Sequence, residues 1–235
     1  PCVSCFAMTA TAKINHDVLH WARERARLTV DQLAKGAHAK PDQVLAWEDG
    51  EKLPPFRQAQ ALASAAHIPF GFLFLARPPE ETLPLPDLRT VAGESLSRPS
   101  VNLLDTVRLV LQKQSWYAEY LKERGHAPLP FVAAFAVGAP VAAVVAGMRR
   151  VLGLAEDQRH GTWEESFAAL VTAADEAGIL VIRNGVVGNN TRRKLDVGEF
   201  RGFAVADALA PLVFINSADA PKARLFTLAH ELAHI

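Results

Sequence analysis

Apolar positions change their spacing along the chain, and each change marks a different kind of predicted structure. Between residues 15 and 75 they recur three and four apart in short runs, which predicts a compact set of helices closed by the aromatic segment IPFGFLFL. Thr29 is placed to cap the second helix and Pro41 to open the third. With a tight turn around Gly36 between them, these two helices follow a helix-turn-helix plan.

A second change begins at residue 77, where prolines become frequent and large apolar residues become scarce. Such a segment cannot pack a core, so the sequence predicts a linker over 77–100. Ser100 is then placed to cap a long helix that reaches about Arg124. Two further helices are expected over 140–152 and 162–177, with a role in packing alone.

A third change follows residue 178, where runs rich in β-branched and aromatic residues appear. The runs 178–183, 200–205 and 212–215 predict a small, mostly antiparallel sheet. The polar loop 188–191 is expected to be a surface turn, with the border of a substrate cleft as the less favoured alternative. The predicted fold class is therefore α+β and rich in helices.

Composition limits the classes of protein that the chain can represent. Half of its 235 residues are hydrophobic, and 25 basic residues balance 25 acidic ones. This balance argues against a strong, non-specific nucleic-acid binder. No apolar run is long enough to cross a membrane and no signal peptide is recognisable, so the expected location is the cytoplasm.

The two cysteines lie at the extreme N-terminus, before Met8. Cys2 and Cys5 form a C-x-x-C pair, but the chain has no second pair to complete a zinc ribbon. Residues 1–7 are therefore assigned no function, and 1–13 are expected to be a disordered or non-native lead-in. The predicted divisions after it are a helix-turn-helix domain over 14–76, the linker over 77–100 and a second domain over 101–235.

The chemistry of the chain is concentrated in its last helix, where His230, Glu231 and His234 form an H-E-x-x-H pattern. On a helix, residues four apart share a face, so the two imidazoles are spaced to bind one zinc ion beside the carboxylate. Two neutral imidazoles leave the charge of the metal uncancelled, so a bound water becomes acidic and a nearby carboxylate can take its proton. The alternative is a chance match, because only three positions of the pattern are fixed.

The surrounding residues predict a helix with one apolar face. Asp219 is expected to be its N-cap and Pro221 to lie in its first turn. The two histidines are expected to lie off the apolar face, together with Thr227. The residues of that face are Leu225, Leu228, Leu232 and Ile235.

The H-E-x-x-H pattern lacks the third protein ligand of a catalytic zinc site. A catalytic zinc site uses three protein ligands, whereas the sequence ends one residue after His234. We therefore expect the chain to be a fragment cut inside its active-site helix, with weakened zinc affinity and no activity. Its apolar helix face is expected to form an exposed patch.

Residues 23–63, RxxxxLTVDQLAKGAxxKPDQVLAWEDGEKLPPFRQAQALA, resemble the helix-turn-helix of Xre and Cro type repressors. The resemblance implies that the third helix would enter the major groove of double-stranded DNA, with Lys40, Asp42, Gln43 and Ala46 near base edges. Of these, Lys40 and Gln43 are the candidate DNA-binding residues. Between residues 15 and 60 there are seven basic and seven acidic residues, so this segment has no excess of positive charge to attract DNA. The alternative is a helical module that docks another protein.

From residue 14 onward the chain resembles the ImmA/IrrE family of metallopeptidases, on the segments PDLRT, EFRGFAV, PLVFIN and RLFTLAHELAH. The resemblance implies a truncated zincin-like domain in which His230 and His234 bind zinc and Glu231 is the general base. It implies a third, acidic ligand on a later helix. The implied activity is a zinc-dependent endopeptidase that cleaves a repressor-like protein. The alternative is a transcriptional regulator or antitoxin-like DNA-binding protein whose peptidase-like domain senses or docks a partner.

Overall fold

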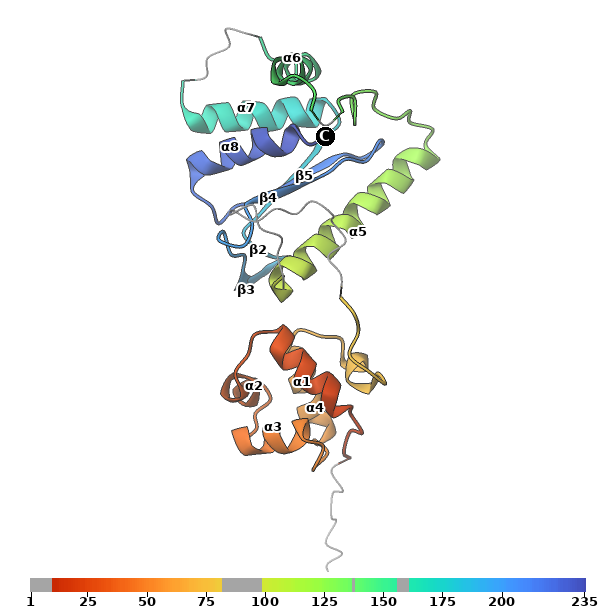
Figure 1. Ribbon diagram of the computed structural model, residues 1–235, viewed down its shortest axis with the longest axis vertical. Helices are drawn as coiled ribbons and strands as arrows, with labels where there is room; N and C mark the ends of the chain where they lie inside the picture. The colour runs from red at the N-terminus through yellow and green to blue at the C-terminus, as the bar shows by residue number, and fades with distance from the viewer. Residues whose placement is uncertain (1–9, 82–98, 137, 156–160) are drawn as a thin grey trace, which may run out of the picture. The chain divides into compact units, whose positions relative to one another are not determined.

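The computed structural model of the protein describes residues 10–81, 99–136, 138–155 and 161–235. The chain forms two compact units, residues 1–82 and 83–235. Each unit has its own buried apolar residues and is described by itself (Figure 1). The predicted PDLRT segment of the linker and the C-x-x-C pair lie outside the described residues.

The first unit is a set of short helices around one core. Leu19, Leu33, Val44 and Leu62, one from each α-helix, are fully buried together. The α2–α3 connection is a four-residue turn over 37–40, as the sequence predicts. The helices are α1 (His16–Arg25), α2 (Val30–Gly36), α3 (Pro41–Glu48), α4 (Phe56–Ala65) and the 3₁₀ helix η1 (Phe70–Phe74).

Local hydrogen bonds fix where these helices begin. The Thr29 hydroxyl accepts a hydrogen bond from Gln32 N at 3.2 Å, and Thr29 N donates to Gln32 Oε1 at 2.9 Å. This reciprocal cap satisfies two backbone groups that the first turn leaves without partners. Pro41 occupies the first turn of α3, where its missing N–H has no cost.

A buried ion pair joins α1 to α3. Glu48 is only 8% exposed, and both of its carboxylate oxygens accept hydrogen bonds from Arg23, at 2.8 and 3.0 Å. The hydrogen bond with Glu48 raises the pKa of Arg23 further, against the opposing effect of burial. This two-point pairing fixes the direction in which the two helices cross.

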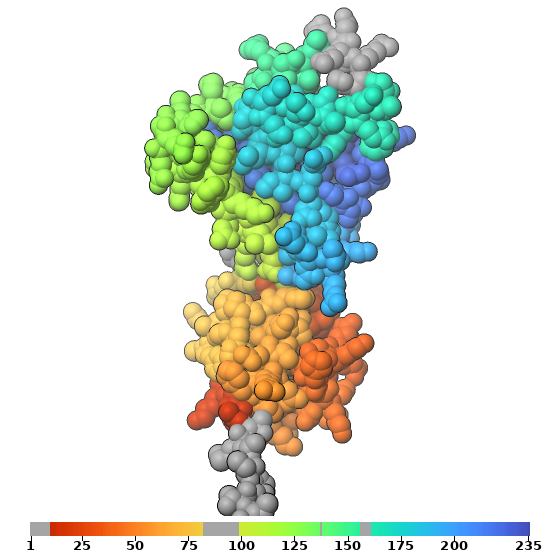
Figure 2. Space-filling model, turned by 180° about the vertical axis from the view of Figure 1, so that it is seen from behind, coloured from red at the N-terminus to blue at the C-terminus, as the bar shows by residue number. Residues whose placement is uncertain are grey.

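The second unit places a sheet between helices. Helix α5 lies on one face of the sheet, and α7 and α8 lie on the other (Figure 1). Figure 2 shows from behind how the C-terminal half of α5 projects from the flank of this unit. Its helices are α5 (Val101–Glu123), α6 (Val141–Val151), α7 (Trp163–Glu176) and α8 (Pro221–Leu232). Its strands are β1 (Leu180–Asn184), β2 (Val186–Val187), β3 (Asn190–Lys194), β4 (Gly202–Val205) and β5 (Leu212–Asn216).

The main sheet is mixed, so the expectation of a mostly antiparallel sheet is wrong for one of its two pairings. The strand order is β1-β5-β4, with β5 parallel to β1 and antiparallel to β4. Two parallel strands need a long connection that brings the chain back to the end where the first strand began. The segment between β1 and β5 is long enough to do so. It includes a separate antiparallel hairpin of β2 and β3. The predicted polar loop 188–191 lies half in the turn of this hairpin, at 188–189, and half in β3.

Strand β5 is the centre of the sheet, and its side chains alternate between the two faces. Leu212 and Phe214 pack with α5, whereas Val213 and Ile215 pack with α7 and α8. All five residues of β5 are buried, as expected for a strand paired on both sides and covered on both faces.

Helix α6 has the predicted packing role, because Met148 packs against the core cluster of α7 and α8, but the helix is mostly exposed. None of its residues is buried, and Val141 is 78% exposed. It covers a cavity of about 280 Å³, whose lining includes Phe131, Met148 and Leu232. Helix α7 agrees with the expectation, because Ala173 and Ala174 are buried in the core. Within the described residues no helix is both long and apolar enough to span a bilayer.

Candidate metal centre

Helix α8 carries the candidate site and begins without the predicted cap. Its N-cap is Ala220, and no side chain caps it. The carboxylate of Asp219 instead accepts a hydrogen bond from Ala220 N at 2.7 Å and pairs with Arg201 at 3.2 Å. The prediction for Asp219 is wrong because its side chain turns back to the residue before β4. The pairing still anchors the start of α8 to that strand.

The buried face of α8 is rotated from the predicted one. Leu228 and Leu232 pack against Val213 and Ile215, so they form part of the core and no exposed patch. Leu225 and Ile235 are half-buried. Thr227 was expected beside the histidines, but it is only 6% exposed. It faces β4, which passes close to the helix there.

Gly202, the first residue of β4, makes this close approach possible. A Cβ atom at this position would lie 2.8 Å from Thr227 Cγ2, 3.2 Å from Glu231 Cγ and 2.8 Å from the carbonyl oxygen of Phe214. Only a residue without a side chain fits between the strand and the helix. Sequence reasoning missed Gly202, although a glycine inside a strand is a known sign of close backbone approach.

The two histidines lie next to each other on the exposed side of α8. Their Nε2 atoms are 3.2 Å apart, and their ring centroids are 4.9 Å apart. Two nitrogens bound to one tetrahedral zinc at about 2.05 Å are separated by about 3.3 Å. The spacing of His230 and His234 therefore fits joint coordination of a single ion.

Glu231 lies on the same helix but is half-buried against β4. Burial raises the pKa of its carboxyl group from 4.5 to about 7, because the charged form loses solvation. A carboxylate with a pKa near 7 can both accept and release a proton at neutral pH. Glu231 is therefore suited to proton transfer near neutral pH.

The side chains of His230 and His234 come together, but no third metal ligand joins them within the described residues. Within residues 10–81, 99–136, 138–155 and 161–235, no group of three or more His, Cys, Asp or Glu side chains is placed to hold a metal ion. The candidate site in these residues is thus a pair of imidazoles 3.2 Å apart, with Glu231 next to His230 in the sequence.

The other predicted site residues, Lys40 and Gln43, lie in the first unit at the start of α3. Both are exposed. The side-chain oxygen of Gln43 accepts a hydrogen bond from Lys40 N at 3.0 Å, so this oxygen helps to cap α3. The amide nitrogen of Gln43 is the part of the side chain with which it could donate to a ligand.

Sequence reasoning also passed over Phe226, one turn before His230 on α8. Its side chain is 76% exposed, and its ring lies nearly parallel to that of His230, with 6.3 Å between the centroids. The periodicity of α8 contained a signal, since Phe226 is a large apolar residue outside the apolar face.

Comparison with known proteins supports the peptidase resemblance for the C-terminal segment. Residues 174–235 match the Peptidase_M78 family, described as the IrrE N-terminal-like domain. The match runs from the end of α7 through the sheet to the whole of α8, and covers 62 of the 235 residues. No curated protein and no solved structure matches the chain. The C-terminal segment is thus similar to a metallopeptidase-type domain.

Proposed function

We propose that the chain carries the zinc-binding helix of a zinc-dependent endopeptidase. The observation that supports this most directly is the 3.2 Å spacing of the His230 and His234 Nε2 atoms, with Glu231 between them in sequence. The match of residues 174–235 to a peptidase family agrees with this chemistry.

In this proposal His230 and His234 hold zinc through their Nε2 atoms, and a third ligand completes the site. Zinc, when bound, supplies a Lewis acid that polarises a peptide carbonyl and makes water acidic near neutral pH. Glu231 takes a proton from the attacking water and passes it to the leaving amine. Its partly buried position against β4 keeps its proton affinity in the range that both transfers need.

The substrate peptide is proposed to bind along the edge of β4 that no described strand covers. Among the described strands, β4 pairs only with β5. Asn216 N donates to Arg201 O at 2.8 Å, so in the alternating antiparallel ladder the backbone groups of Gly202 and Ala204 point away from β5. An extended peptide can add to such an edge through main-chain hydrogen bonds. The proposed substrate is a repressor-like regulatory protein.

The test is cleavage of candidate repressors and zinc binding by the intact gene product that contains this chain, as wild type and with Glu231→Gln or His230→Ala. E231Q should lose cleavage while keeping zinc, whereas H230A should lose both. His126→Ala, an exposed histidine outside the site, is the matched control and should change neither. Equal cleavage by E231Q and wild type would reject Glu231 as the base and with it the mechanism.

A second candidate function is DNA binding by the first unit. Its support is the succession of α2, a four-residue turn and α3, with exposed Lys40 and Gln43 at the start of α3. A gel shift at several salt concentrations, on upstream DNA, tests it. Lys40→Ala should weaken binding and make it less sensitive to salt, whereas Lys122→Ala on α5 should not. Absence of a salt-sensitive specific band would favour a protein-docking role.

A further inference from the structure

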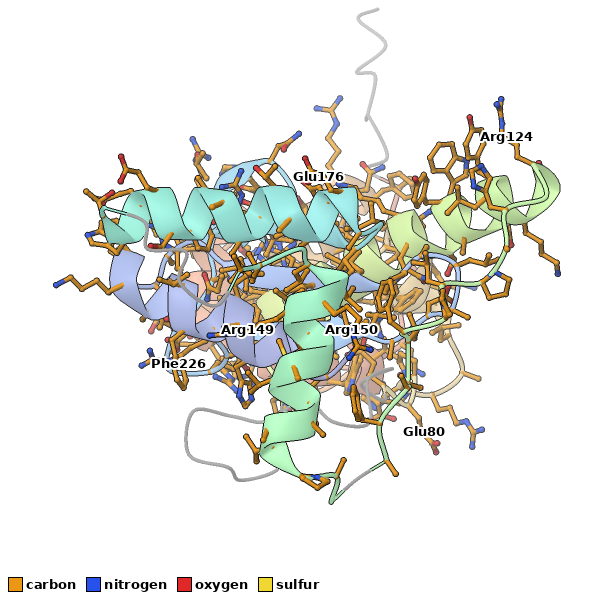
Figure 3. All side chains as sticks on the ribbon, turned by 90° about the horizontal axis from the view of Figure 1, so that it is seen from above. Glu80, Arg124, Arg149, Arg150, Glu176 and Phe226 are labelled. Atoms are coloured by element: carbon orange, nitrogen blue, oxygen red, sulfur yellow. The ribbon has the colours of Figure 1, made fainter. Side chains whose placement is uncertain are left out.

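An aromatic side chain borders the candidate site without contributing to the core. Phe226 is 76% exposed, and Figure 3 shows it on the side of α8 that faces away from α7. Its ring lies at 16° to that of His230. A side chain with so much exposed surface stabilises the fold little, and a ligand that covers it would remove that apolar surface from water.

The arrangement of α8 on the sheet defines what lies next to this ring. Going round the helix, Leu228 and Leu232 lie over β5, and Thr227 and Glu231 lie over β4. The next positions in the same direction, at 100° per residue, are those of His234, His230 and then Phe226. This direction round the helix leads from the β4 side of α8 towards the edge of the sheet, where no further described strand pairs with β4.

We propose that Phe226 is a specificity-determining residue, which contacts a large apolar side chain of a peptide extended along the edge of β4. This inference rests on the proposed endopeptidase function and adds a substrate class to it. Apolar contact removes the ring of Phe226 and the substrate side chain from water together, and a small polar side chain cannot replace that gain.

The spacing of residues along α8 and along an extended peptide indicates which substrate residue Phe226 would contact. Phe226 and His230 are one helical turn apart, about 5.4–6 Å along the axis. Side chains on the same face of a strand recur every two residues, about 6.6 Å apart. The preferred apolar residue is therefore about two positions from the bond that is cleaved.

The experiment compares two peptides that differ only at that position, with Leu in one and Ser in the other. Wild-type protein with zinc should favour the Leu peptide in kcat/KM by about tenfold or more. Phe226→Ala should bring the ratio close to one, and Phe226→Leu should restore most of it. Trp116→Ala removes another exposed aromatic residue, 66% exposed on α5, and should leave the ratio unchanged.

Two further measurements separate the possible failures. If F226A keeps the preference, or lowers Tm and zinc affinity while the preference stays, Phe226 is a packing residue and the inference is wrong. If E231Q cleaves like wild type, the proposed function fails instead. If no variant cleaves, fluorescence anisotropy of the two labelled peptides decides: tighter binding of the Leu peptide by wild type but not by F226A supports the inference, and equal binding overturns it.

Discussion

Glu231 shows how a single carboxyl group acquires its properties from the backbone beside it. Gly202 lets β4 approach α8 so closely that the stem of Glu231 is partly covered by the strand. Burial then raises its pKa to about 7. The raised pKa couples the protonation of this residue to the stability of the fold.

In metal-free protein, stability should fall as the pH rises from 4.5 towards 7. The folded state then holds a proton on Glu231 that the unfolded state has released, so raising the pH favours unfolding. The pKa difference corresponds to at most about 3 kcal/mol, and partial exposure reduces this to about 2 kcal/mol. Urea unfolding with a chelator at pH 5 and pH 8 measures it.

Glu231→Gln should flatten this pH dependence, because the amide does not titrate. The exposed Glu176 offers the matched control Glu176→Gln, which should keep the wild-type slope. A slope that E231Q leaves unchanged would show that another group is responsible.

At the scale of elements, helix starts that depend on short local patterns were predictable at three helices, whereas the cap of α8 was not. Thr29, Ser100 and Thr162 each accept a hydrogen bond from the backbone three residues later. The parallel pairing of β1 with β5 was not predictable, because it depends on residues about 30 positions apart. The exposure of α6 and the rotation of α8 likewise depend on which neighbours are available to cover them.

The same division holds within the candidate site. The spacing of His230 and His234 follows from helix geometry, so their proximity was predictable. The covering of Glu231 by Gly202 and the outward position of Phe226 require the sheet to be placed first. Sequence alone therefore identified the candidate histidine pair and the candidate base, but not the strand that adjoins Glu231.

The N-cap of α5 should contribute more to the free energy of unfolding than an ordinary helix cap does. Ser100 caps α5, and both its N–H and its hydroxyl donate to the buried carboxylate of Glu199. Ser100→Ala removes the cap and one partner of this carboxylate, so we expect a loss of about 2–3 kcal/mol in unfolding free energy.

The exposed cap Thr162 of α7 provides the comparison, since it has no such partner. Thr162→Ala should cost about 1 kcal/mol. Chemical denaturation of both variants measures the difference. Equal losses would mean that the contact with Glu199 adds nothing to the cap.

At the scale of the whole molecule, the chain consists of two units with separate cores. The buried cluster of the first unit contains Leu33 and Leu62, whereas the clusters of the second contain Leu212 and Leu228. No residue belongs to the clusters of both units. Damage to one core should therefore stay within its unit.

Leu33→Ala tests this independence. Leu33 is fully buried, so its truncation should cost about 2–5 kcal/mol and lower the melting temperature of the first unit. Circular dichroism should show this loss, while zinc titration shows unchanged binding in the second unit. Leu53→Ala, at a position 42% exposed, should have little effect on either measurement. A parallel fall in zinc affinity would show that the units depend on each other.

The open edge of β4 has a consequence for the rate at which its amide hydrogens exchange with solvent. The amide of Phe203 points to β5 and should exchange slowly, whereas those of Gly202 and Ala204 point outward and should exchange quickly. A peptide that adds to this edge would protect the two fast amides and leave the slow one unchanged. This alternation would report occupancy of the edge residue by residue, even in protein that cleaves nothing.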